Sequence, residues 1–218
     1  MTWTEAEIAD RVGADIEDGW VVNLGVGMPT LVAERLSTRS VLVHAENGIL
    51  GVGPPPPAGM EDPDIIDPGK NPVTIVPGAA YMDSGVSFAV IRGGHLDLAV
   101  MGAFQVSATG DLANWRLPGR RGGAIGGAAD LAAGSRRVWV MTLHSTKTGE
   151  PKLVRRCDYP LTAAGVVTRV YTDLAVLDVV SHGFRAVQLA PGVSADEVVA
   201  RTDAPVEIAR PSDAVVAK

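Results

Sequence analysis

Strand-like and helix-like segments alternate near the start of this sequence, and the alternation constrains the fold more than any other feature. Residues 20–24 are short and rich in β-forming side chains, and residues 41–43 predict a second strand, buried on both faces. Between them, residues 29–36 can form a helix with Pro29 in its first turn. A strand, a helix and a strand in this order predict two parallel strands joined by a right-handed crossover.

Helix and strand signals continue to the end of the chain. Thr4 with Glu7, and Ser194 with Glu197, have the spacing of capping boxes that begin helices, and the first helix should end at Asp18-Gly19. The other predicted elements are a helix capped by Ser84 that runs to Arg92 and strands at 73–76, 96–101, 138–141, 170–180 and 184–189. This pattern predicts an α/β fold with a mixed, largely parallel sheet covered by helices on both faces.

Two segments rich in glycine or proline interrupt the pattern. Residues 51–72 contain four consecutive prolines and are too long to be a simple connector, so we expect an irregular surface excursion there. Residues 119–127 form a second glycine-rich loop. No repeat or linker divides the sequence, and we therefore expect a single domain over residues 1–218.

Composition excludes several functional classes. The net charge of −6, without a long basic run, argues against a nucleic-acid partner. No apolar stretch reaches the ~18 residues that a membrane helix needs, and the N-terminus lacks the features of a signal peptide. The one cysteine, Cys157, cannot form an internal disulfide, which suits a reducing compartment. We therefore expect a soluble, cytoplasmic protein.

The glycine-rich turn after the first strand has two interpretations. Gly25-x-Gly27-x-x-Thr30, with an acidic residue about twenty positions later, half matches a dinucleotide-binding fingerprint. The third glycine is replaced by Thr30, and Pro29 removes a backbone donor that would face a pyrophosphate, so the match is weak. The turn could contact a substrate, or its glycines could serve only to make the turn, and both interpretations stay open.

Other catalytic and metal-binding patterns are incomplete. Gly85-Val86-Ser87-Phe88-Ala89 lacks the last glycine of a nucleophile elbow, and no matching base lies nearby in the sequence. The four histidines stand singly, and Cys157 has no cysteine partner, so no metal site is predicted. His44 differs from the others because it lies two residues before Glu46 on a strand and should project to the same face.

Glu46 is the strongest candidate for a catalytic side chain. It ends an apolar, strand-like run and is followed by Asn47-Gly48, a pair that favours a tight turn. A carboxylate is costly to bury there, and as a nucleophile it could attack an acyl-CoA thioester. Gly51 and Gly53 would let a bulky cofactor tail approach the backbone. The alternative is a glutamate that merely precedes a turn, and spacing alone leaves the two interpretations even.

Several motifs resemble one enzyme family in the same order along nearly the whole chain. The Ala45-Glu46-Asn47-Gly48 segment resembles the Ser-Glu-Asn-Gly signature of the beta (B) subunit of class I, 3-oxoacid-type CoA-transferases. The other matching segments are 22–30, 64–70, 91–97, 110–115, 126–131, 172–176 and 190–193. The resemblance implies the family's open three-layer α/β sandwich.

The resemblance also implies roles for particular residues. Glu46 would be the nucleophile that carries CoA between two acids by a ping-pong sequence. The backbone amides of Gly127 and Ala128 would donate to the thioester oxygen. Asn47-Gly48 and Lys70 would contribute to substrate binding. Lys70 would add positive charge near the substrate carboxylate or help to hold the loop around the site. Coenzyme A would be a substrate and not a permanently bound cofactor.

The implied reaction transfers CoA from succinyl-CoA to a 3-oxo acid, either acetoacetate or 3-oxoadipate. A separate alpha subunit would complete the active site in a heterodimer or heterotetramer. An acyl-CoA hydrolase and a catalytically silent partner subunit remain alternatives. The sequence departs from the family at Ala45, where Ser is usual, at His44, where Gln is frequent, and at Arg120-Arg121, where lysines are usual.

Overall fold

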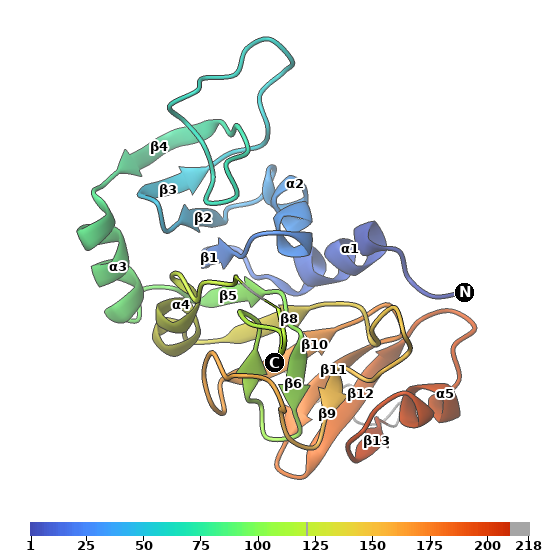
Figure 1. The fold of residues 1–218 in the computed structure, drawn as a ribbon. Coiled ribbons are helices and arrows are strands. Elements are labelled where there is room, and N and C mark those ends of the chain that lie inside the picture. Colours follow the sequence, from blue (N-terminus) through green and yellow to red (C-terminus); the bar gives the residue numbers. More distant parts are fainter. Residues whose placement is uncertain (121, 210–218) are drawn as a thin grey trace.

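The computed structural model describes residues 1–120 and 122–209 of the chain. Within these residues, one mixed sheet contains ten strands: β1 (Val21–Leu24), β2 (Leu42–Ala45), β3 (Ile49–Val52), β4 (Ile75–Tyr81), β5 (Leu98–Met101), β8 (Val138–Met141), β10 (Val167–Tyr171), β11 (Ala175–Val180), β12 (Gly183–Leu189) and β13 (Val206–Ile208). Their order is β13-β12-β11-β10-β8-β5-β1-β2-β3-β4 (Figure 1). The central strands β2, β1, β5, β8 and β10 are parallel, and antiparallel strands extend the sheet on both sides. The predicted mixed sheet is confirmed.

Helices cover both faces of this sheet. They are α1 (Glu5–Asp15), the 3₁₀ helix η1 (Met28–Val32), α2 (Ala33–Leu36), α3 (Ser84–Arg92), α4 (Ala128–Gly134) and α5 (Ala195–Ala200). α1 packs against η1 and α2, and α3 packs against α4 (Figure 1). The step from β1 to β2 runs in one direction along the strand order, and the step from β5 to β8 runs in the opposite direction. Because both connections are right-handed crossovers, α2 and α4 lie on opposite faces of the sheet. The predicted three-layer sandwich is confirmed.

A second sheet of three short strands was not predicted. In the described residues it consists of β6 (Gln105–Ser107), β7 (Leu112–Ala113) and β9 (Leu153–Val154), in the order β7-β6-β9. Val106, Leu112 and Leu153 are fully buried and belong to the main hydrophobic core. Strands of two or three residues are too short to show an alternating pattern, and only their packing against the larger sheet defines them.

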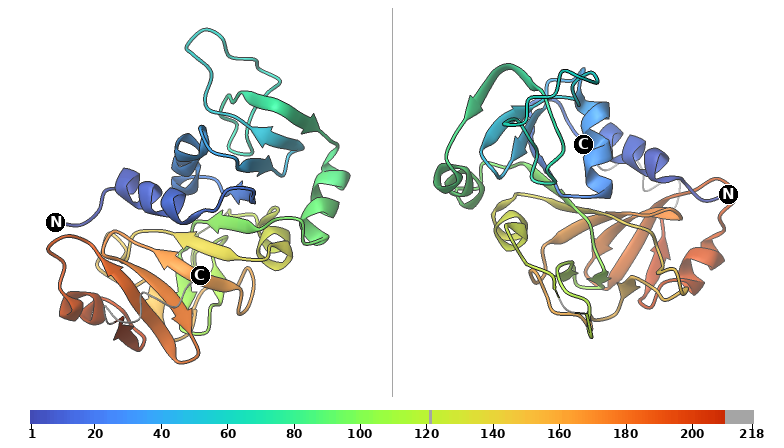
Figure 2. Two further views of the ribbon diagram at one scale, coloured as in Figure 1. Left: turned by 180° about the vertical axis from the view of Figure 1, so that it is seen from behind. Right: turned by 45° about the horizontal axis from the view of Figure 1, so that its top comes forward.

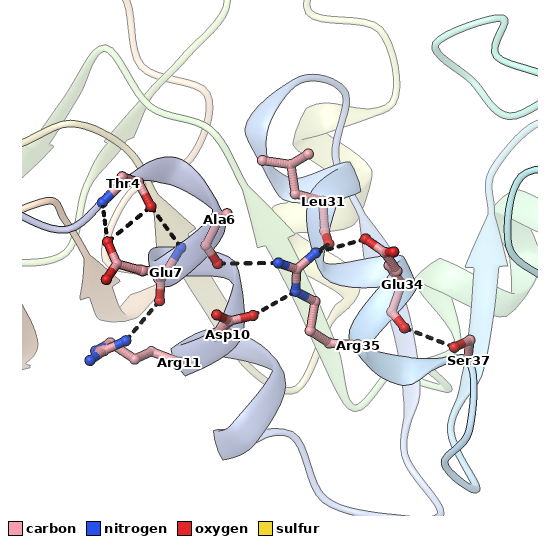
Figure 3. A network of polar contacts seen from close by, with 9 residues as sticks. All are labelled: Thr4, Ala6, Glu7, Asp10, Arg11, Leu31, Glu34, Arg35 and Ser37. Carbon is pink, nitrogen blue, oxygen red and sulfur yellow. Dashed lines mark hydrogen bonds and ion pairs between the residues drawn. The ribbon is translucent and has the colours of Figure 1, made fainter.

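Side-chain contacts fix the N-terminal helix to the layer that it shares with α2 (Figure 3). The Thr4 hydroxyl accepts from the Glu7 amide at 3.2 Å, and the Glu7 carboxylate accepts from the Thr4 amide at 2.8 Å, which completes the predicted capping box. Arg35 of α2 donates to the Asp10 carboxylate at 2.7 Å and to the Ala6 carbonyl. These bonds join α1 to α2.

Two helix boundaries differ from the predictions. α1 ends at Asp15 rather than at Asp18-Gly19, because Ile16 adopts an extended backbone and its side chain is buried in the core. The cap of α3 is Asp83 rather than Ser84, and its carboxylate accepts from the Val86 amide at 3.0 Å. Both residue types cap helices, so the sequence could not distinguish these neighbours. The predicted cap of α5 is confirmed.

Strand predictions also needed correction. Leu42 in β2 is 41% exposed, so this strand is not buried on both faces; the side chain lines an open groove beside Leu36 and Val52. The apolar run at 170–180 is two antiparallel strands, because the Thr172 hydroxyl accepts amides at Leu174 and Ala175 and forms a turn. A turn inside an apolar run leaves no mark in the hydrophobic pattern, so the sequence predicted one strand there.

The predicted excursion lies between β3 and β4. β3 occupies residues 49–52, and the irregular segment that follows is a long loop that projects beyond the sheet in Figure 1 and in the left view of Figure 2. Its later part returns to the β2–β3 hairpin, where the Ile66 carbonyl accepts from Asn47. β4 begins at Ile75, two residues later than predicted, and runs to Tyr81. No helix in the described part of the chain is both long and apolar enough to cross a bilayer.

Candidate active site

A cleft of about 550 Å³ lies at the carboxyl edge of the parallel strands. Residues that follow β1, β5 and β8 line it, together with the loop before α4. The chain continues from β1 to β2 on one side and returns to β5 on the other, so β1 and β5 form a topological switch point. Open α/β sheets bind ligands at such points, and the volume suits a small molecule.

Glu46 is positioned in this cleft by a tight turn. Ala45 pairs with Ile49 across the β2–β3 hairpin, and the Gly48 amide donates to the Ala45 carbonyl at 3.0 Å. Glu46 is therefore the first residue of a three-residue loop, and its half-buried side chain lines the cleft. The predicted turn is confirmed. The turn places the Glu46 side chain in the lining of the cleft.

The turn requires glycine at position 48. Gly48 has a φ of 121°, and a Cβ added there would lie 2.2 Å from the Met82 carbonyl oxygen. Gly48→Ala should therefore lower the free energy of unfolding by about 2–4 kcal/mol through strain and collision. Gly59→Ala is the matched control, because Gly59 has a φ of 82° but open space around it. Denaturant unfolding of both variants would separate the effects, and equal losses would contradict the collision.

A chain of buried polar groups leads from Glu46 into the protein. Asn23 in β1 donates its Nδ2 to Glu46 Oε2 at 3.0 Å and to the His44 carbonyl at 3.1 Å. The same amide lies 3.3 Å from His44 Nδ1, and His44 Nε2 lies 3.0 Å from Ser87 Oγ. Because an amide NH₂ can only donate, Nδ1 accepts and a neutral His44 donates from Nε2 to Ser87. His44 thus reaches Glu46 through Asn23.

Burial keeps two histidines neutral. Burial lowers the pKa of His44 to about 4, and burial, the largest effect, also lowers the pKa of His144 to about 4. Between pH 6.5, the ordinary pKa, and pH 4, the unfolded chain binds protons that these folded histidines do not. The free energy of unfolding should consequently fall as the pH drops through this window.

The size of this acid effect can be measured. Each histidine should change the free energy of unfolding by roughly 3 kcal/mol at most across this pH window, since one pKa unit corresponds to about 1.4 kcal/mol. Denaturant unfolding between pH 7 and pH 4 should show the decline, and His144→Gln should make the slope shallower. Identical slopes in the variant and the wild type would refute the assignment to His144.

The loop before α4 brings Gly127 and Ala128 to the same cleft. A Cβ added at Gly127 would lie 3.0 Å from Phe88 Cζ, so the ring of Phe88 favours glycine there, and it would lie 3.6 Å from Glu46 Cγ, so Gly127 is beside Glu46. The Gly127 amide donates to none of the described residues. The Ala128 amide, however, donates to the Ile125 carbonyl at 3.0 Å, so of the two predicted donors only Gly127 has no acceptor among the described residues. Hydrogen bonding within the turn explains the difference.

The other predicted binding residues lie outside the cleft lining. Asn47 donates its Nδ2 to the Ile66 carbonyl at 2.7 Å and so anchors the segment between β3 and β4. Lys70 is exposed, with a φ of 65°, and its neighbour Gly69 approaches Val26 on the cleft rim. Lys70 therefore borders the cleft but does not line it. Arg120 is exposed, and Arg121 lies outside the described residues.

The glycines after the turn pack against the protein itself. A Cβ at Gly51 would collide with Ala79 and Val76, and one at Gly53 would collide with Thr74. These glycines therefore let β4 and Thr74, the residue before it, pack closely against the backbone of residues 51–53. Hairpin packing accounts for both glycines without a ligand, and the expectation that they make room for a cofactor tail stays a prediction.

Two residues of the site were missed from the sequence. Asn23 could have been identified from the sequence, because a polar side chain inside the apolar run of β1 is costly to bury unless it forms hydrogen bonds. Lys152 lines the cleft and donates to the Thr142 hydroxyl at 3.0 Å, but its position in the sequence offered no signal. The described residues contain no group of three His, Cys, Asp or Glu side chains suited to a metal ion.

This fold and this cleft, with one carboxylate held at a turn, define an α/β enzyme that acts on a small molecule. The chain belongs to the coenzyme A transferase family, and the family model matches residues 6–201. The resemblance found in the sequence is thereby confirmed.

Known relatives agree on the kind of subunit. The chain is 53% identical to the B subunit of the 3-oxoadipate CoA-transferase of Pseudomonas putida, with 89% of this chain and 92% of that protein covered. It is 44% identical to the B subunit of a succinyl-CoA:3-ketoacid coenzyme A transferase of Helicobacter pylori, across 92% and 97% of the two chains. The acyl-CoA transferase YdiF of Escherichia coli O157:H7 shares the fold, with a TM-score of 0.75 and 19% identity. The match covers 96% of this chain but 43% of YdiF.

Proposed function

We propose that this chain is the beta subunit of a CoA-transferase that moves CoA from succinyl-CoA to a 3-oxo acid. The observation that carries the proposal is the geometry of Glu46. Its carboxylate projects from a tight turn into a cleft, and Asn23 holds one oxygen at 3.0 Å. No described residue binds the other oxygen, Oε1, which is therefore available to attack a substrate.

The chemistry proceeds through two exchanges at Glu46. One carboxylate oxygen attacks the thioester carbon of succinyl-CoA, the carbon–sulfur bond breaks, and CoA leaves as the thiolate. The thiolate then attacks the Glu46 carboxyl carbon of the mixed anhydride and releases succinate. The product is a glutamyl-CoA thioester. A 3-oxo acid repeats the two steps in reverse order and leaves as its CoA thioester, with Glu46 restored.

The loop before α4 would stabilise the oxyanion that forms in each attack. The Gly127 amide is the candidate donor, since no described residue accepts from it. The Ala128 amide would have to break its hydrogen bond to the Ile125 carbonyl before it could also donate to the oxyanion. Lys70 and the Asn47-Gly48 turn would act from the rim, where Asn47 holds the neighbouring segment against the hairpin. We expect CoA to bind as a substrate and not as a resident cofactor.

An alpha subunit would complete this site. The relatives in Pseudomonas putida and Helicobacter pylori are each named as the B subunit of their enzyme, and YdiF is more than twice the length of the matched region. Val26, Ile125 and Leu143 line the cleft and are all exposed, so they offer an apolar surface that a partner would cover. We expect a heterodimer or heterotetramer in the cytoplasm. The acceptor would be acetoacetate or 3-oxoadipate.

Mass spectrometry of the assembled complex tests the proposal. After incubation with succinyl-CoA alone, the peptide that contains Glu46 should carry CoA, and the Glu46→Gln variant should not. Release of free CoA without an adduct would favour the acyl-CoA hydrolase. A labelled glutamate elsewhere, with Glu46 unmodified, would identify this chain as the silent partner and refute the proposal.

A further inference from the structure

A lysine lies in the cleft with Glu46 and is not used by the proposed exchanges. Lys152 precedes β9, and its Nζ donates to Thr142 Oγ1 at 3.0 Å, at the carboxyl end of β8. The Thr142 hydroxyl donates in turn to the Ala103 carbonyl at 3.1 Å, so its oxygen can accept from the lysine. These bonds hold the amine at a defined place in the cleft lining.

Lys152 lacks an anionic partner. Among the residues that the structure describes, no carboxylate lies within ion-pair distance of its Nζ. Burial, the largest effect, lowers the pKa of Lys152, and the more distant charge of Asp173 raises it. A partly buried ammonium is costly without a counter-ion, and one neutral hydroxyl satisfies only one of its three donors. An anion bound in the cleft would remove this cost.

We propose that Lys152 binds the distal carboxylate of a dicarboxylic acyl group whose other end reacts at Glu46. The inference rests on the proposed function, because it places the succinyl chain between the two residues. Glu46 and Lys152 line one cleft and have opposite charges, so the two ends of a diacid bound there would meet different groups: the acyl carbon would meet Glu46 and the distal carboxylate Lys152. A monocarboxylic acyl group leaves the lysine unpaired.

The test compares two acyl donors in the assembled complex. Lys152→Met should lower kcat/KM for succinyl-CoA by about 10- to 100-fold, the size expected for losing a charged hydrogen bond. With acetoacetyl-CoA, which has no distal carboxylate, the loss should stay below about threefold. Lys152→Arg should retain part of the preference for succinyl-CoA over acetoacetyl-CoA, because arginine keeps the positive charge. Lys147→Met is the matched control, because Lys147 is exposed and does not line the cleft.

The outcomes separate the two proposals. Equal losses with both donors would show that Lys152 has only a structural role, and no loss with either would show that it does not bind substrate; each result overturns the inference. In both cases the wild-type complex would still form the CoA adduct at Glu46. Failure of the wild type to form that adduct with either donor would instead remove the proposed function.

Discussion

Replacing Glu46 with glutamine is expected to lower CoA transfer by at least about 10⁴-fold, the largest of the expected effects. The amide keeps the shape of the side chain but cannot form the mixed anhydride. Steady-state transfer between succinyl-CoA and acetoacetate by the complex of both subunits would measure the loss. The glutamine retains a carbonyl oxygen that can accept from Asn23, so the substitution removes little else.

Two controls make this result specific. The free energy of unfolding of Glu46→Gln should change by less than about 1 kcal/mol, because the side chain is half-buried and the Asn23 bond can persist. Glu46→Asp should retain a small activity, since the shorter side chain keeps a nucleophile but withdraws it from the substrate. A glutamine variant with more than about a tenth of the wild-type rate would rule out covalent catalysis by Glu46.

Replacing Asn23 with aspartate is expected to have the second largest effect, a loss of about 10²- to 10³-fold in kcat. The change is nearly isosteric, but it substitutes an acceptor for the donor that lies 3.0 Å from Glu46 Oε2. Two carboxyl groups at this distance share one proton rather than both ionising. The nucleophile would then be protonated or turned away, and the residual activity should require a higher pH than the wild type.

The same substitution at another asparagine provides the control. Asn114 also lines the cleft, but its Nδ2 donates to the Gly102 carbonyl and not to Glu46. Asn114→Asp should therefore leave the pH dependence of kcat unchanged. If Asn23→Asp reduced kcat without moving the pH profile, or if both variants moved it equally, Asn23 would not be the residue that positions the nucleophile.

Several features of the fold followed from local chemistry. The capping box at Thr4 and Glu7, the cap at Ser194 and the parallel pair β1–β2 were predicted because each depends on neighbouring residues or on one short crossover. The boundaries were less predictable. Asp83 and Ser84 are equivalent as caps until the backbone selects one of them, and the turn at Thr172 lies within an apolar run.

The position of Glu46 followed from the sequence because a strand, a carboxylate and an Asn-Gly turn are adjacent in the chain. The residues that surround Glu46 could not be predicted in the same way. Asn23 reaches Glu46 because β1 and β2 pair in a register that sets Asn23 opposite His44, and Lys152 enters the cleft because β6 pairs with β9. Such contacts depend on strand register and on the packing of layers, which join residues far apart in the chain. Local pattern therefore singled out Glu46 as the candidate nucleophile, and long-range packing selected the groups that contact it.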